Sequence, residues 1–221
     1  MSNLNINAGL PTEKHESVKV AVLGAGAFGT AMATIAARQD HKVVIYSRDA
    51  NQVDHINKNH INNRYLSEHE LLPNITATMD ISEATKDSAL IIHCIPAQVT
   101  PSFLEKNKEY IPKNAILCST TKGLYLKTKQ LLSEPILEIL GRDQPLAFLS
   151  GPSFAAELMK DAPSAVVVAS ERLYHAVKIQ RYVDMLLFFN VSKFYNITHW
   201  VVCIEGYCHP LRFVFIAHRI S

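Results

Sequence analysis

The sequence predicts an α/β fold with a doubly wound, mostly parallel sheet, and three neighbouring segments support this prediction. Residues 18–23 form a short β-branched run, and residues 29–39 have the pattern of an Ala-rich helix after a glycine-rich turn. Residues 42–46 are a second strand-like run that follows a short turn. Together they make a strand–helix–strand unit of roughly 30 residues, which favours a parallel sheet because parallel strands need a crossover connection.

The same alternation continues along the chain. Further strand-like apolar runs occupy residues 89–95, 115–118, 146–149 and 165–169. Helical patterns occupy residues 101–108, 128–140 and 172–182. Residues 51–73 are rich in Asn and His and have weak periodicity, so we predict a short helix and a surface loop there.

Composition argues against several classes of protein. The net charge of +2 comes from 22 basic and 20 acidic residues spread along the chain, so we expect no nucleic-acid partner. No run reaches the roughly 18 apolar residues of a membrane span, and the N-terminus lacks the apolar segment of a secretory signal. Cys94 and Cys118 lie in apolar strand-like runs, so we expect a reducing, cytoplasmic location.

A glycine-rich turn joins the first strand to the first helix. Gly24, Gly26 and Gly29 form the pattern G-x-G-x-x-G directly after a strand and at the start of a helix, the context that dinucleotide binding requires. Gly24 permits the tight turn, Gly26 lets the backbone approach a pyrophosphate, and Gly29 lets helix and strand pack closely. The free N–H groups of the helix would then face the phosphates. The alternative is a glycine turn without a ligand.

The end of the second strand bears on the choice between NAD and NADP. A fold specific for NAD places an acid there to hold the ribose 2′-hydroxyl, whereas this chain has Ser47, Arg48 and Asp49. Arg48 could meet the 2′-phosphate of NADP, and Asp49 keeps NAD open. The alternative is an ordinary surface ion pair.

Two further segments follow strands and would reach the sheet edge at which open α/β folds bind ligands. Lys122 follows the run at residues 115–118 and could hold a substrate phosphate or hydroxyl as a compact charge; the alternative is a solvated loop lysine. Residues 150–157 combine small residues with Ser153, whose hydroxyl and neighbouring backbone donors could approach a ligand. The alternative there is a Gly-Pro turn in which Ser153 caps the next helix.

The chain divides into three parts where the character of the sequence changes. Residues 1–17 are polar and are expected to form a disordered leader, and residues 18–182 a dinucleotide-binding domain. Residues 183–221 lose the helical pattern, and we expect this tail to be unfolded or to result from an error in the gene model. No metal site is expected, because the Cys and His spacing of the tail does not match a zinc knuckle. The residues considered for one were His199, Cys203, Cys208 and His209.

Five segments form a specific combination. They are the glycine-rich turn, Asn62-Asn63-Arg64-Tyr65-Leu66, Ile95-Pro96-Ala97-Gln98, Thr121-Lys122-Gly123-Leu124 and Leu149-Ser150-Gly151-Pro152-Ser153-Phe154-Ala155. In order and spacing they resemble the NAD(P)-dependent glycerol-3-phosphate dehydrogenase family, over approximately residues 18–182. A generic Rossmann-type protein would share only the first motif.

The resemblance implies hydride transfer between NAD or NADP and the middle carbon of a three-carbon phosphate. The reaction would interconvert dihydroxyacetone phosphate and sn-glycerol 3-phosphate, for phospholipid synthesis. By match to the family's motifs, the cofactor contacts would come from Ala27, Phe28, Arg48 and Ala155, the substrate contacts from Gly151 and Ser153, and both from Lys122. Lys122 would be the catalytic residue of this chain, since its charge would stabilise the charge that grows as hydride arrives. Members of the family are often homodimers.

The resemblance also implies an all-helical second domain, which we expect to be absent from this chain. That domain normally opens with a Gly-Ala-Leu-Lys-Asn-type segment, whose lysine is the general acid/base, and carries an Arg-Asn pair for the substrate phosphate. Neither follows Tyr182, so we expect weak or no turnover. Intron read-through or a frame change in the gene model would produce such an ending. The alternative function is an NAD(P)-binding module without catalytic activity.

Overall fold

The computed structural model describes residues 16–122, 124–151, 153–162, 164–183 and 187–191. Its elements follow in the order β1 (Lys19–Leu23), α1 (Ala27–Arg38), β2 (Lys42–Tyr46), α2 (Ala50–Asn59), β3 (Ile75–Thr78), α3 (Ile81–Thr85), β4 (Leu90–His93), α4 (Thr100–Asn107), η1 (Lys108–Tyr110), β5 (Ile116–Ser119), β6 (Leu124–Tyr125), β7 (Gln130–Leu131), α5 (Ser133–Leu140), β8 (Leu146–Ser150), α6 (Ala155–Met159), β9 (Ala165–Ser170), α7 (Leu173–Tyr182) and β10 (Leu187–Val191). The predicted alternation of strands and helices is therefore present.

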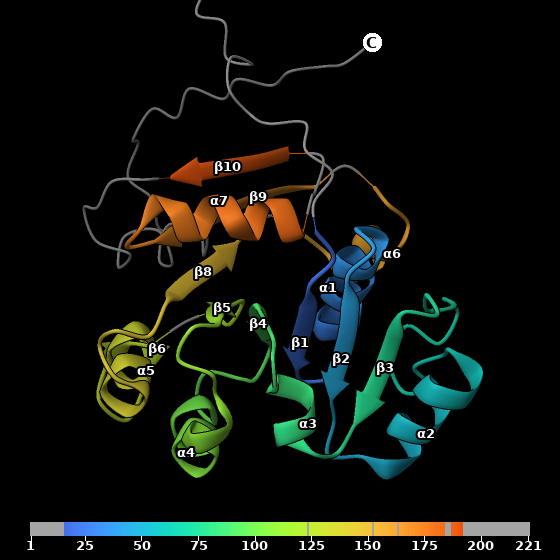
Figure 1. The fold of residues 1–221 in the computed structure, drawn as a ribbon, viewed down its shortest axis with the longest axis horizontal. Helices are drawn as coiled ribbons and strands as arrows, with labels where there is room; N and C mark the ends of the chain where they lie inside the picture. Colours follow the sequence, from blue (N-terminus) through green and yellow to red (C-terminus); the bar gives the residue numbers. More distant parts are fainter. Residues whose placement is uncertain (1–15, 123, 152, 163, 184–186, 192–221) are drawn as a thin grey trace, which may run out of the picture.

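Eight strands form one sheet in the order β10-β9-β8-β5-β4-β1-β2-β3 (Figure 1). From β8 to β3, every neighbouring pair is parallel. Strand β9 runs antiparallel to β8, and β10 runs parallel to β9. The predicted mostly parallel α/β fold is confirmed.

Strand β1 lies where the order of strands reverses. It pairs on one side with β2 and on the other with β4, so the chain first winds outward to β3 and then returns to build the second half. Loops that leave adjacent strands at such a point diverge, and open α/β sheets bind their ligands there, at the carboxyl ends of the strands. The ends of β1, β2, β4, β5 and β8 share this edge because these strands are parallel.

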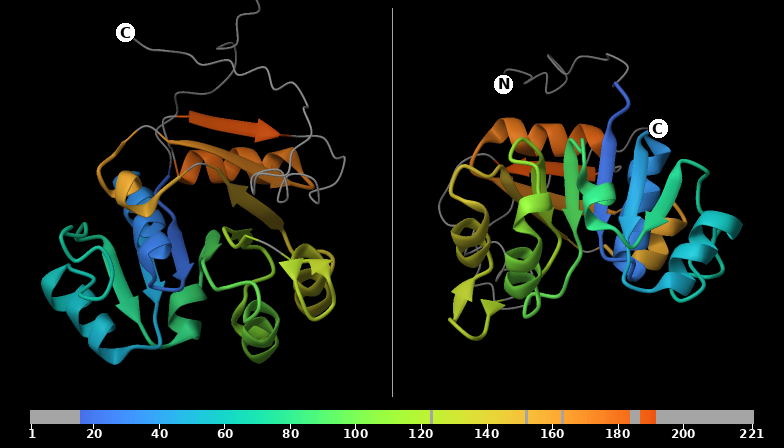
Figure 2. Two further views of the ribbon diagram at one scale, coloured as in Figure 1. Left: turned by 180° about the vertical axis from the view of Figure 1, so that it is seen from behind. Right: turned by 60° about the horizontal axis from the view of Figure 1, so that its bottom comes forward.

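Both faces of the sheet are covered by helices. Val20 and Val22 of β1 point into a core formed with α1, α2, α6 and α7, whereas Ala21 and Leu23 point into a second core formed with α3, α4 and α5. Figure 1 shows α1 beside α6 and well away from α4 and α5, and both views in Figure 2 agree. This two-sided burial explains why the central strands are continuously apolar.

Arg38, at the end of α1, joins the two halves of the fold. Its guanidinium donates to the carbonyl oxygens of Leu158 (2.8 Å) and Met159 (2.6 Å) and pairs with Asp161 (3.2 Å). The two carbonyls belong to the last turn of α6, and that of Leu158 also accepts from the N–H of Asp161 (3.2 Å). Arg38 therefore fixes α6 against α1.

Two details of the predicted secondary structure were wrong. The helix predicted at residues 128–140 begins only at Ser133, because Gln130–Leu131 pair with Leu124–Tyr125 as a two-stranded hairpin. Lys129 has φ +56°, which ends any helical path before that point. The surface loop predicted within residues 51–73 contains Asn62, which is completely buried.

Parts of two predictions lie outside the described residues. Only residues 16 and 17 of the leader are described, and of the tail only Val183 and the backbone of β10. No helix in the described segments combines the length and apolar character needed to cross a membrane.

Candidate functional site

The glycine-rich turn packs so tightly that two of its glycines leave no room for a side chain. Gly24 has φ +115°, and a Cβ there would lie 3.0 Å from the carbonyl oxygen of Cys94. A Cβ on Gly29 would lie 1.9 Å from the carbonyl oxygen of Gly24. Both positions therefore require glycine. By contrast, nothing lies within 4 Å of the Cβ position on Gly26, so there is space beside its backbone.

Helix α1 begins without a side-chain cap. Gly26 is its N-cap residue, and its first turn contains no acidic residue. The N–H groups of Ala27 and Phe28 have no acceptor inside the helix, because their acceptors would precede it. The twelve-residue helix therefore presents a partial positive charge and free donors beside Gly26. This arrangement suits an anion such as a phosphate.

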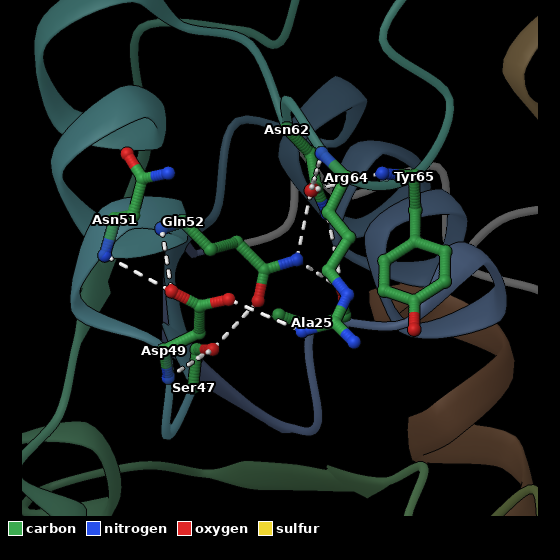
Figure 3. Close-up of polar contacts among 8 residues, drawn as sticks. All are labelled: Ala25, Ser47, Asp49, Asn51, Gln52, Asn62, Arg64 and Tyr65. Atoms are coloured by element: carbon green, nitrogen blue, oxygen red, sulfur yellow. Dashed lines mark hydrogen bonds and ion pairs between the residues drawn. The ribbon is translucent and has the colours of Figure 1, made fainter.

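Two buried amide side chains lie beneath the turn (Figure 3). Gln52 Nε2 donates to the carbonyl oxygen of Ala25 (2.9 Å), and Asn62 Nδ2 donates to the same oxygen (3.0 Å). Asn62 Nδ2 also donates to Thr30 Oγ1 (2.7 Å), and Gln52 Nε2 to Asn62 Oδ1 (2.8 Å). Neither amide was among the predicted site residues. The sequence pointed to Asn62 only through its place in one of the five segments that resemble the family.

Just after β2, both carboxylate oxygens of Asp49 have partners within the protein. Its Oδ1 accepts from the N–H groups of Asn51 (3.0 Å) and Gln52 (3.3 Å) as the N-cap of α2, and its Oδ2 pairs with Arg64 Nη1 (3.2 Å). The Gln52 N–H and the Arg64 guanidinium hold the pKa of Asp49 below its usual value. Arg48 is exposed and bonds to no other described residue. A surface ion pair between Arg48 and Asp49 is therefore not formed.

Lys122 is exposed on the loop that follows β5 and makes no hydrogen bond or ion pair with another described residue. The residues before it are anchored to the end of β4. Thr120 Oγ1 donates to the carbonyl oxygen of His93 (3.1 Å), and Thr121 Oγ1 to that of Ile95 (2.7 Å). Gly123, the next residue, lies outside the described residues.

Gln98 anchors the same loop on the far side of Lys122. Its Nε2 donates to the carbonyl oxygen of Leu124 (2.7 Å), and its Oε1 accepts from the N–H of Leu126 (3.1 Å). The side chain thus bonds the backbone much as a neighbouring strand would. The loop is held on both sides of Lys122, although sequence reasoning gave Gln98 no role.

His93 is completely buried at the end of β4, beneath this loop. The hydroxyls of Thr100 and Thr121 lie 3.5 Å and 3.4 Å from its two ring nitrogens. Burial lowers the pKa of His93 to about 4, so the ring is neutral near pH 7. Burial also raises the pKa of the Cys94 thiol to about 12 and that of the Cys118 thiol in the same direction. Both free thiols therefore stay protonated near pH 7.

The segment after β8 begins with Gly151, which is buried. The N–H of Ser153 donates to the carbonyl oxygen of Gly151 (2.9 Å), and its hydroxyl donates to the same oxygen (3.4 Å). Helix α6 starts at Ala155 with Phe154 as its N-cap residue and no side-chain cap, so the alternative in which Ser153 caps the helix is wrong. Pro152 lies outside the described residues.

The structure connects the glycine-rich turn to three other strand ends. The N–H of Gly24 donates to the carbonyl oxygen of Tyr46, at the end of β2 (3.1 Å). Cys94, which follows β4, lies against Gly24 and accepts a hydrogen bond at Sγ from Thr120, which follows β5 (3.3 Å).

Lys122 and Ser153 leave the neighbouring parallel strands β5 and β8 at the same edge, and no hydrogen bond joins them. Within the described ranges, no group of three His, Cys, Asp or Glu residues is placed to hold a metal ion. The four Cys and His residues of the tail, His199, Cys203, Cys208 and His209, lie outside those ranges.

The chain is similar to one family over most of its length. The model of the NAD-dependent glycerol-3-phosphate dehydrogenase N-terminus matches residues 19–176. A chloroplastic NAD(+) glycerol-3-phosphate dehydrogenase of Arabidopsis thaliana is 42% identical over 165 residues, covering 72% of this chain and 39% of that protein. An NAD(P)+ glycerol-3-phosphate dehydrogenase of Acinetobacter baumannii is 37% identical over 176 residues, covering 80% and 49%.

Solved structures give the same result. The crystal structure of glycerol-3-phosphate dehydrogenase from Coxiella burnetii matches with a TM-score of 0.74 at 28% sequence identity, over 80% of this chain and 54% of that chain. The Plasmodium falciparum enzyme matches with a TM-score of 0.71 at 28% identity. The chain spans half or less of the length of these curated relatives. On this evidence, the chain belongs to the NAD-dependent glycerol-3-phosphate dehydrogenase family and corresponds to its N-terminal domain.

Proposed function

We propose that residues 18–182 bind NAD or NADP and contribute the cofactor-binding part of a glycerol-3-phosphate dehydrogenase. The reaction is hydride transfer between NAD(P)H and dihydroxyacetone phosphate, or the reverse from sn-glycerol 3-phosphate. The observation that carries the proposal is the turn at residues 24–29, in which two glycines are required by packing and Gly26 has open space beside the uncapped start of α1. Family membership supports the choice of substrate.

The residues present fit a dinucleotide. The N–H groups of Gly26, Ala27 and Phe28 would donate to the pyrophosphate. Arg48 is unpaired among the described residues whereas both carboxylate oxygens of Asp49 have partners, which favours a 2′-phosphate and hence NADP. When bound, the nicotinamide supplies or accepts the hydride.

Lys122 would serve as the electrostatic group of the reaction. Its side chain is exposed at the carboxyl edge of the parallel strands, on a loop that Thr121 and Gln98 anchor on both sides. A positive charge there would stabilise the negative charge that develops on the substrate oxygen. Gly151, Ser153 and Ala155 would approach the substrate and cofactor from the next strand end.

The purified chain tests the proposal directly. Fluorescence titration with NADH and with NADPH measures binding, and loss of nicotinamide absorbance with dihydroxyacetone phosphate measures turnover. Binding of either cofactor supports the assigned site, and the absence of both refutes it. Binding without turnover would favour the alternative of an NAD(P)-binding module.

If the purified chain turns over dihydroxyacetone phosphate, replacing Lys122 with methionine is expected to lower the turnover number about 100-fold, because a single electrostatic donor commonly has an effect of this size. Methionine keeps the length of the side chain and removes its charge. Lys127→Met is the matched control, since Lys127 is exposed on the adjacent hairpin and has no assigned role. Equal turnover numbers for the two variants, both measurable above the rate without protein, would remove Lys122 from the catalytic site.

Replacing Arg48 with alanine is expected to weaken NADPH binding about tenfold or more, as expected for one charge-assisted contact to a phosphate. NADH binding should change little, because NADH lacks the 2′-phosphate. Parallel titrations of the wild type and the variant give the ratio of Kd values for each cofactor. An equal loss of affinity for NADH would instead place Arg48 against a part that the two cofactors share.

A cytoplasmic location and a homodimer are further parts of the proposal. The free thiols of Cys94 and Cys118 are consistent with a reducing compartment, and one relative is chloroplastic by name. Microscopy of the fluorescently tagged chain would distinguish these compartments, and sedimentation would give the oligomeric state.

A further inference from the structure

The carbonyl oxygen of Ala25 is held by two side chains instead of by backbone groups (Figure 3). Gln52 Nε2 and Asn62 Nδ2 donate to it at 2.9 Å and 3.0 Å. A carbonyl oxygen has two lone pairs, so its accepting capacity is filled. Ala25, Gln52 and Asn62 are all buried, and the contacts are therefore shielded from competition by water.

Each amide has only one acceptable orientation. The Ala25 oxygen can only accept, so the amide atoms that face it must be nitrogens. In this orientation Asn62 Oδ1 accepts from Gln52 Nε2 and from the backbone N–H groups of Arg64 and Tyr65, both at 3.2 Å. A buried network in which donors and acceptors match favours a single arrangement.

This network determines the direction of the Gly26 N–H. In a trans peptide the C=O and the N–H point in opposite directions, and the described residues contain no cis peptide. Because the Ala25 carbonyl points into the buried network, the Gly26 N–H points away from it. No described residue accepts from that N–H, and the Cβ position of Gly26 is open. The next carbonyl, that of Gly26, accepts from both the N–H and the hydroxyl of Thr30 (2.9 Å each).

Without the network, the peptide between Ala25 and Gly26 could flip. A peptide flip between Ala25 and Gly26 changes ψ of the first residue and φ of the second, and glycine accepts either sign of φ. We propose that Asn62 and Gln52 are positioning residues that prevent this flip and so hold the Gly26 N–H toward the pyrophosphate of the cofactor. This inference rests on the proposed function. Gln52 also links the turn to the end of β2, since its Oε1 accepts from the hydroxyl of Ser47 (2.6 Å).

Cofactor affinity gives the first test. Asn62→Ala removes one donor from the Ala25 carbonyl, the contact with Thr30 and the Oδ1 acceptor of the network. If a tenth of the molecules then keep the required orientation, the Kd values for NADH and ADP-ribose both rise about tenfold, because apparent affinity scales with the competent fraction. Gln52→Met keeps the length of the side chain and leaves the Asn62 donor in place, so a smaller rise is expected. It also provides a variant should Asn62→Ala fold poorly.

Asn74→Ala is the matched control. Asn74 Nδ2 also donates to two backbone carbonyls, those of Ala37 and His41 (2.8 Å each), but at the opposite edge of the sheet. It should leave both Kd values unchanged, whatever it costs in unfolding free energy. Unchanged affinity in both the Asn62 and Gln52 variants, or an equal loss in the Asn74 variant, would overturn the inference.

Nuclear magnetic resonance gives a second test that needs no cofactor. Relaxation dispersion of the Gly26 backbone nitrogen should show microsecond-to-millisecond exchange in Asn62→Ala and none in the wild type or Asn74→Ala. If the wild type binds no cofactor but this exchange is present, the proposed function fails and the positioning role stands. If the wild type binds and neither variant shows exchange or weaker affinity, the positioning role fails and the function stands.

Discussion

Replacing Gly29 with alanine should destabilise the fold by about 3 kcal/mol, the upper part of the usual range for overpacking, and abolish cofactor binding. The added Cβ would lie 1.9 Å from the carbonyl oxygen of Gly24. That oxygen belongs to backbone and cannot rotate away. Gly24 is itself fixed by its contact with Cys94 and its bond to Tyr46. The start of α1 must therefore move away from β1. Urea denaturation with linear extrapolation measures the loss.

Gly26→Ala is the companion variant, because it differs only in what the Cβ meets. Gly26 has φ −72° and ψ 177°, which alanine adopts without strain, and nothing lies within 4 Å of the new atom. The unfolding free energy should stay close to that of the wild type, while affinity for NADH and NADPH falls because the methyl group occupies the phosphate's space. Retained affinity would show that the phosphate does not approach Gly26.

Acidification should remove about 3 kcal/mol of folding stability through His93 alone, the free-energy equivalent of its pKa change from 6.5 to about 4. Between these two values the unfolded chain binds more protons than the folded chain. The contribution of His93 is therefore complete above pH 6.5 and is lost progressively as the pH falls toward 4. The free energy of unfolding measured at several pH values gives this slope.

His93→Gln isolates the effect from those of other titrating groups. Glutamine retains a donor and an acceptor near the hydroxyls of Thr100 and Thr121 but does not titrate in this range. The variant should show a flatter pH dependence between 4 and 6.5, even if its stability near pH 7 is lower. Parallel curves for the two proteins would mean that the pKa of His93 is the same in the folded and unfolded states.

The central part of the fold could be predicted from local sequence. Residues 42–46 were predicted as a strand and form β2 with the same bounds. A short β-branched run that is buried on both faces strongly favours a strand. The edge strand Ile75–Thr78 is short and half polar, and it was not predicted. The hairpin that replaces the first turn of the predicted helix at residues 128–140 depends on pairing across the chain, which propensity does not report.

The residues of the candidate site also fall into those that local sequence predicts and those that it does not. The glycines could be predicted because their roles follow from backbone geometry within six residues. Asn62 could not, because its partners Ala25 and Thr30 lie more than thirty positions away and an Asn-rich segment normally indicates exposure. Asp49 was considered as a cofactor ligand, but the start of α2 and Arg64 use both of its oxygens.

Parallel pairing on both sides of β1 has a consequence for how the chain acquires its structure. Val20 of β1 pairs with Val43 on one side and with Leu90, much later in the sequence, on the other. In the same way, Leu117 of β5 pairs with Leu146 of β8 only after the intervening hairpin and helix have been made. From β1 to β8, no two neighbouring strands of the large sheet are joined by a tight turn. The entropy of closing long loops is therefore lost before the corresponding contacts form, which makes folding slow compared with that of a helical bundle of similar size. During synthesis, the edge of β1 that pairs with β4 stays unpaired until β4 has left the ribosome, and an apolar strand with an unpaired edge is prone to aggregation.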